Sequence, residues 1–171
     1  MRGSLLFLSD EKLLQLCRVD VFRGSGPGGQ KRNKTSNSIR LTHPPSGVSA
    51  VAGESRSQQI NKLHALRRLR LKLAMQLREP IAASFEPPDW FLEIRHKGKL
   101  QASYRHPHYA ATAGIVLDLL MATQGSPAKV GVMLGISTGE VIRFLRREPL
   151  LWTCANRIRT ELGLVFLNPH D

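Results

Sequence analysis

Residues 38–53 read SIRLTHPPSGVSAVAG, and the fold of the first half of the chain follows from this segment. SIRLTH and VSAVAG have the length and composition of short strands. PPSG between them is a turn sequence, because proline presets the backbone angle and glycine tolerates a left-handed conformation. The stretch therefore predicts a β-hairpin.

The segments around this hairpin predict one further strand and two helices. Upstream, residues 10–16 form a short predicted helix, and CRVDVFR at 17–23 alternates apolar and polar residues as a half-buried strand does. Downstream, residues 55–78 show helical periodicity, with apolar side chains at Ile60, Leu63, Leu66, Leu69, Leu73 and Leu77. Basic side chains fill much of the remaining helix surface: Arg67, Arg68, Arg70, Lys72 and Arg78. This order predicts a small α+β domain with a long helix across one face of a sheet.

The chain is strongly basic, and the charge is uneven. Its formal net charge is +12 over 171 residues. Residues 1–104 hold 18 Lys and Arg against 8 Asp and Glu, whereas residues 105–171 hold 7 against 5. A solvated surface that keeps the protein soluble is one explanation. A nucleic-acid partner contacted mainly by the first half is the favoured one.

The composition of the chain limits which other classes of protein it can belong to. An apolar fraction of 42% is enough for a folded core. The apolar runs are shorter than a membrane span, the N-terminus is a poor signal peptide, and the two cysteines lie far apart. We therefore expect a cytoplasmic protein that does not contact a membrane and contains no disulfide.

A glycine-rich loop, RGSGPGGQ at residues 23–30, follows the first predicted strand. Its G-x-G-x-x-G spacing matches the dinucleotide fingerprint, but the next segment is too short for the required crossover helix. A P-loop needs Lys and then Ser or Thr after the last glycine, where this chain has Gln30 and Lys31. Ser25 lacks the frame of a nucleophile elbow, and His106 and His108 lack a second ligand cluster. We predict no metal and no cofactor.

The tip of this loop offers hydrogen-bond donors rather than proton-transfer groups. The backbone N–H groups near Gly28 and Gly29 are unobstructed by a Cβ atom, and Gln30 adds an uncharged amide. Such donors can stabilise a developing oxyanion and position a water molecule, as in acyl-transfer sites. The water-activating groups would then come from a partner, and the cations that flank the tip indicate a phosphate-rich one.

Over residues 17–78 the motifs GSGPGGQ, NKTSNSIRL, THPPSGV and ESRSQQINKLHALRRL resemble the catalytic domain of class I peptide chain release factors. Among these the chain looks most like the short, codon-independent ribosome-rescue members. The resemblance implies a release-factor-like domain that hydrolyses the ester of peptidyl-tRNA in the large ribosomal subunit. It assigns catalysis to Gly28, Gly29 and Gln30, with Gln30 also a site of N-methylation by a methyltransferase. It assigns RNA contacts to Arg23, Ser25, Lys31, Arg32, Asn33, Lys34, Thr35 and Arg56.

The second half departs from that family. Full release factors carry further domains that read stop codons, and no segment here resembles one, so we expect codon-independent release by a monomer. Residues 128–147 fit a helix-turn-helix pattern, with Gly135 at the turn and Ser137 and Glu140 as a capping box. Arg143, Arg146 and Arg147 on its second helix are a predicted second RNA contact. A helical module that binds no nucleic acid fits the same pattern.

These patterns divide the chain into three parts. Residues 1–79 form the predicted catalytic domain, residues 80–107 a proline-containing connector partly held by Trp90 and Phe91, and residues 108–171 a small all-α, helix-turn-helix-like domain. The alternative function is a noncatalytic RNA- or ribosome-binding adaptor that retains the release-factor fold. The GGQ tip favours the enzyme, because an adaptor has no need of it.

Overall fold

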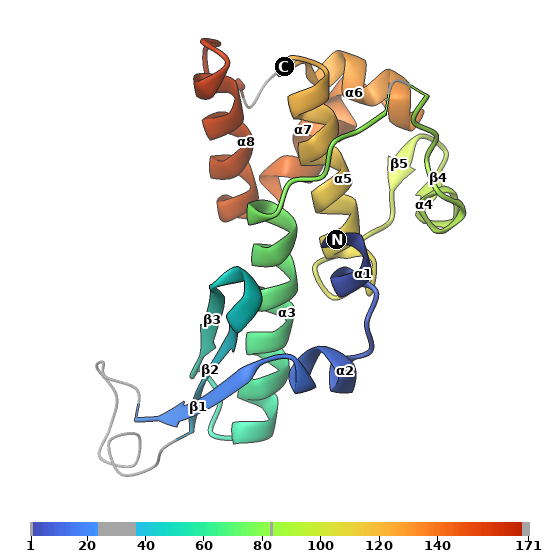
Figure 1. Cartoon of the computed structure of the whole chain (residues 1–171). Helices are drawn as coiled ribbons and strands as arrows, with labels where there is room; N and C mark the ends of the chain where they lie inside the picture. The colour runs from blue at the N-terminus through green and yellow to red at the C-terminus, as the bar shows by residue number, and fades with distance from the viewer. Residues whose placement is uncertain (1, 24–36, 83, 169–171) are drawn as a thin grey trace. The chain divides into compact units, whose positions relative to one another are not determined.

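The computed structural model describes residues 2–23, 37–82 and 84–168 (Figure 1). The chain divides into two compact units, Met1–Gln76 and Leu77–Asp171. Helices and strands are combined as the α+β prediction requires, with an antiparallel sheet in the first unit and mainly helices in the second. No helix within the described ranges is both long and apolar enough to cross a membrane.

The first unit is a three-stranded antiparallel sheet with one long helix packed on it. Its elements are α1 (Arg2–Leu6), α2 (Asp10–Gln15), β1 (Arg18–Phe22), β2 (Ser38–His43), β3 (Val48–Ala52) and α3 (Gln58–Gln76). A short 3-10 turn, Pro44–Ser46, joins β2 to β3, and Gly47 follows it at φ 68°, a left-handed conformation that glycine adopts without strain. The predicted hairpin is confirmed, and β2 is the central strand, between β1 and β3.

One face of this sheet makes the core with α3. Ile39 and Leu41 of β2 and Ala50 of β3 are buried, as are Ala65 and Leu69 of α3. Figure 1 shows α3, in light green, running along the sheet. The predicted apolar periodicity begins earlier than the core does, since Ile60 and Leu63 are 45% and 42% exposed.

Basic side chains of α3 close the outer edge of the sheet. β3 is an edge strand, so its outward carbonyls have no strand partner. The Arg68 guanidinium donates to the Val51 oxygen over 2.7 Å, and the Lys72 ammonium donates to the Ser49 oxygen over 2.9 Å. These cations were expected on the solvated surface of the helix, but they satisfy backbone acceptors that a further strand would otherwise use.

The second unit is mainly helical. It contains α4 (Asp89–Ile94), β4 (Arg95–His96), β5 (Lys99–Leu100), α5 (Tyr109–Ala122), α6 (Pro127–Leu134), α7 (Thr138–Arg146) and α8 (Pro149–Glu161). α5 is buried on nearly every side and forms the centre of the core. Residues 80–107, predicted as a connector, contain α4 and a two-stranded hairpin; the three-part division stays a prediction.

The α6–turn–α7 segment is closely packed at Gly131 and Gly135. A Cβ atom on Gly131 would lie 2.7 Å from the Ile136 oxygen, so only glycine fits there. Gly135 ends α6 at φ 65°, and the Ser137 hydroxyl accepts from the Glu140 N–H at the start of α7. The Glu140 side chain was predicted to complete a capping box. It is instead buried against β5, where it accepts a hydrogen bond from the Leu100 N–H.

Candidate functional site

The structure describes only the base of the predicted catalytic loop. Gly28, Gly29 and Gln30 lie outside the described residues, and so do Ser25, Lys31, Arg32, Asn33, Lys34 and Thr35. Arg23 and Asn37 are the described residues on either side of this segment, and Arg23 is exposed. The candidate site is therefore built from the residues that fix the loop base.

The two strands that lead into the loop are paired up to its base. The last pair in the register is Phe22 of β1 with Ser38 of β2. The Arg40 guanidinium lies over the Phe22 ring, 5.1 Å from its centroid, which adds a cation–π contact between the strands. Ser38 is buried, and a Cβ atom on Gly53 would lie 2.4 Å from its hydroxyl oxygen. Glycine at 53 therefore lets the end of β3 approach the loop base.

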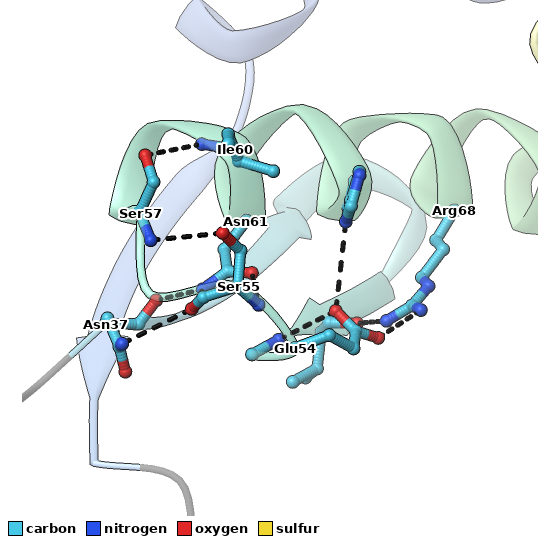
Figure 2. A network of polar contacts seen from close by, with 10 residues as sticks. Asn37, Glu54, Ser55, Ser57, Ile60, Asn61 and Arg68 are labelled. Carbon is cyan, nitrogen blue, oxygen red and sulfur yellow. Dashed lines mark hydrogen bonds and ion pairs between the residues drawn. The ribbon is translucent and has the colours of Figure 1, made fainter. Parts of the chain in front are cut away.

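Asn61 of α3 binds the chain at the point where the loop returns to the sheet. Its side chain is fully buried. The Nδ2 group donates to the backbone oxygens of Asn37 and Ser55, over 2.7 and 2.8 Å, and Oδ1 accepts from the Ser55 N–H over 2.9 Å (Figure 2). One side chain thus joins the helix, the β3–α3 connection and the first described residue after the loop.

Asn37 strengthens this anchor with its own amide. Its Nδ2 group donates to the oxygens of Ser55 and Arg56, over 3.3 and 3.4 Å. Figure 2 shows Asn37, Ser55 and Asn61 gathered near the start of α3. We call Asn37, Ser55 and Asn61 the loop-anchoring network. The network also fixes Arg56, a predicted RNA contact, because the Arg56 backbone oxygen accepts a hydrogen bond from Asn37. The Arg56 side chain is exposed.

An ion pair lies beside this network. Glu54 accepts a hydrogen bond from Arg68 and another from the Gly53 N–H, and the His64 ring lies 3.9 Å away. Burial acts to raise the pKa of Glu54, but the hydrogen bonds and the Arg68 charge outweigh it, so the pKa lies below its usual value. Glu54 is therefore an anion at neutral pH that neutralises a cation close to the anchor.

Sequence reasoning assigned no role to Asn61 or Asn37, although both lie in the motifs that carry the resemblance. Asn61 lies four residues before Ala65 and eight before Leu69, on the apolar face of α3. A single amide side chain on the core-facing side of a helix needs hydrogen-bond partners inside the protein. This requirement was the signal in the sequence that Asn61 has a structural role.

The cations predicted as a second RNA contact have different environments. Arg143 is paired with Glu140 and its side chain is 60% exposed, and Arg146 is also exposed. The Arg147 guanidinium donates to the backbone oxygens of Leu100 and Ala102, over 3.2 and 2.8 Å, and to Glu140. Arg147 therefore binds its own chain.

The histidine pair shows no metal geometry. The His106 ring nitrogen accepts from the His108 N–H over 3.2 Å, and the Trp90 ring lies 5.0 Å from the His108 ring. Burial and the neighbouring His106 lower the pKa of His108. The part of the chain that the structure describes holds no group of three or more His, Cys, Asp or Glu side chains that could bind a metal ion.

The first unit matches a known family of domains. Residues 13–87 match the family model described as the RF-1 domain. Peptide chain release factor 1 of Syntrophobacter fumaroxidans is 50% identical over 60 residues, which cover 35% of this chain and 17% of that protein. The same factor of Acidiphilium cryptum is 47% identical over 66 residues, covering 39% and 19%.

A second type of release factor shows the same partial match. Peptide chain release factor 2 of Mycobacterium tuberculosis is 52% identical over 56 residues, which cover 33% of this chain and 15% of that protein. The chain thus spans less than a fifth of the length of these relatives. Residues 13–87, which hold the sheet, the long helix and the anchored loop base, match the RF-1 domain model, and the similar proteins are peptide chain release factors.

Proposed function

We propose that this protein hydrolyses the ester of peptidyl-tRNA on stalled ribosomes or split large subunits, without reading a codon. The observation that carries the proposal is the RF-1 match over the sheet, loop base and α3, with GGQ at residues 28–30 between the paired strands. Donors at a rigidly based loop tip suit oxyanion stabilisation, since their orientation must be set before the reaction.

Each loop residue has a role in this proposal. The Gln30 backbone N–H stabilises the oxyanion, its side chain places the water, and Gly28 and Gly29 give the tip its backbone freedom. The cations around the loop, with Arg23 and Arg56 among the described residues, seat it against ribosomal RNA. A methyltransferase that modifies Gln30 is a transient partner in the bacterial cytoplasm.

The proposal that release is independent of a codon assigns a separate role to the second unit of the chain. Residues 77–171 fold as a separate, mainly helical unit that lies largely outside the range of the RF-1 match. We assign to this unit the recognition of the stalled particle rather than the recognition of a stop codon.

The test is release of labelled peptide from purified ribosomes stalled on truncated mRNA. Gly29→Ala is the matched variant, because it adds one methyl group to the tip and leaves the charge unchanged. A parallel reaction carries a stop codon in the A site, and a third uses isolated large subunits with bound peptidyl-tRNA.

Each result has a distinct meaning. Release that requires Gly29 and is equal with and without the stop codon supports rescue hydrolysis. Release only from isolated large subunits would mean that the substrate is peptidyl-tRNA on ribosomes that have already split. Binding to both particles without release from either would refute hydrolysis and favour the noncatalytic adaptor.

A further inference from the structure

The β4–β5 hairpin of the second unit has a strained and basic tip. Arg95 pairs with Leu100 and His96 with Lys99, so Lys97 and Gly98 form a two-residue turn. Both have positive φ, 47° and 70°. Asn-Gly is the preferred pair in such a turn, and a long side chain such as lysine is unfavourable at a left-handed position. An unfavourable lysine at an exposed tip suggests that its charge has a use.

This hairpin is fixed to the α6–turn–α7 segment. The Arg95 guanidinium donates to the Leu134 oxygen at the end of α6 over 3.0 Å. A Cβ atom on Gly135 would lie 2.0 Å from that guanidinium, so the turn glycine makes room for it. On β5, the Leu100 N–H donates to Glu140 over 3.1 Å, and Arg147 donates to the Leu100 oxygen. The hairpin and α7 are therefore one rigid structure.

The exposed side chains of this structure are mainly cationic. We define the hairpin–α7 surface as His96, Lys97, Lys99, Arg143 and Arg146, all of them exposed. Its anion, Glu140, is buried and shared between Arg143 and Arg147. Residues 77–171 hold 11 Lys and Arg against 9 Asp and Glu, so this unit is only mildly basic as a whole. The cations are concentrated rather than spread over it.

We propose that the hairpin–α7 surface binds the phosphate backbone of RNA. A rigid array of Lys and Arg suits phosphate contacts, which position a protein on a nucleic acid without reading its sequence. The choice of RNA over DNA rests on the proposed function, because a ribosome-bound protein is surrounded by RNA. Arg147, predicted from sequence as a contact, is excluded from the surface, and the hairpin lysines take its place.

The experiment measures binding of the full chain to a fluorescent RNA stem-loop by anisotropy at several salt concentrations. Lys97→Gln/Lys99→Gln is compared with Lys129→Gln/Arg157→Gln, which removes two exposed cations of α6 and α8 in the same unit. Each lost phosphate contact lowers the slope of log K against log salt by about 0.7 to 0.9. We expect the hairpin variant to lose about 1.4 to 1.8 units of slope. Equal slopes in the two variants would overturn the proposal.

A second variant separates RNA binding from folding. Lys97→Asn removes the charge and places a residue that tolerates left-handed backbone at the turn. We expect an unchanged or higher Tm together with weaker RNA binding, and an unchanged RNA affinity would overturn the proposal. Tighter binding to a DNA duplex of the same sequence would overturn the assignment to RNA. The proposed hydrolysis is tested separately, by the peptide-release assay with Gly29→Ala. A negative result in that assay leaves the RNA-binding results unaffected.

Discussion

The Asn61 Nδ2 group donates to the Asn37 backbone oxygen over 2.7 Å, which connects the core face of α3 to the chain that returns from the GGQ loop. Because Asn61 is fully buried, the bond is shielded from competing water. The loop base is thus anchored by the helix as well as by the strand pairing of β1 and β2.

Asn61→Asp is expected to destabilise the protein and to lower peptide release. The substitution keeps the shape of the side chain but replaces both N–H donors with an acceptor. The Asn37 oxygen then loses the Asn61 donor, and the Ser55 oxygen keeps only the longer bond from the Asn37 side chain. We expect a loss of about 2 to 4 kcal/mol in the free energy of unfolding, measured by urea denaturation. Gln59→Glu, an amide-to-acid change at an exposed position of the same helix, is the control and should cost less than about 0.5 kcal/mol. Equal losses would contradict an anchoring role for Asn61.

Gly53→Ala and Gly139→Ala are expected to act in opposite directions. A Cβ atom on Gly53 meets the Ser38 hydroxyl oxygen at 2.4 Å, whereas one on Gly139 of α7 meets nothing within 4 Å. The first change should cost about 1 to 3 kcal/mol through overpacking. The second should stabilise the exposed helix position by about 0.5 to 1 kcal/mol. Thermal denaturation measures both, and adding Ser38→Ala to Gly53→Ala should recover part of the loss.

Arg78→Met is expected to be strongly destabilising. Arg78 lies 3.1 Å from the Asp118 carboxylate, which is completely buried in α5. Removing the cation leaves a buried anion without its partner charge, a change that costs about 3 to 5 kcal/mol. Adding Asp118→Asn should recover much of this loss in urea denaturation. Arg157→Met breaks the exposed pair with Glu161 and should change stability by less than about 1 kcal/mol.

Tyr109→Phe is expected to keep or increase stability. Its ring packs 5.4 Å from that of Phe144, but its buried hydroxyl has no hydrogen-bond partner among the described residues. Removing an unsatisfied buried hydroxyl should be neutral or stabilising by up to about 1 kcal/mol. A clear loss of stability in urea would show that the hydroxyl is hydrogen-bonded.

The ionisation of Tyr109 is also expected to lower the stability of the protein at alkaline pH. Burial, and then the nearby Glu148, raise the pKa of Tyr109 from 10.0 to about 12. A raised pKa means that the folded state holds the proton more tightly than the unfolded state, so stability is full below pH 10 and falls as the pH rises toward 12. The chain has 2 tyrosines, so Tyr104→Phe leaves Tyr109 as the single tyrosine whose ionisation changes the ultraviolet absorbance. Tyr109→Phe should remove this part of the pH dependence.

Several elements of the fold follow from local patterns in the sequence. The hairpin at residues 38–53 and the long helix follow from alternation, turn residues and helical periodicity, and these patterns act over a few neighbouring positions. The same holds for the α6–turn–α7 segment, where Gly131 and Gly135 have no substitute. The catalytic role of the GGQ tip was also predicted from a short motif, and it stays a prediction because residues 28–30 lie outside the described residues.

Which polar side chains stabilise the fold depends on contacts between residues that are distant in the sequence. Arg68, Lys72 and Arg147 read as solvated or RNA-binding cations, yet each donates to backbone oxygens of its own chain. Asn61 binds Asn37 across 24 positions of sequence. A buried donor or acceptor must find a partner wherever the fold brings one, and that partner is set by distances in space that local sequence patterns do not encode.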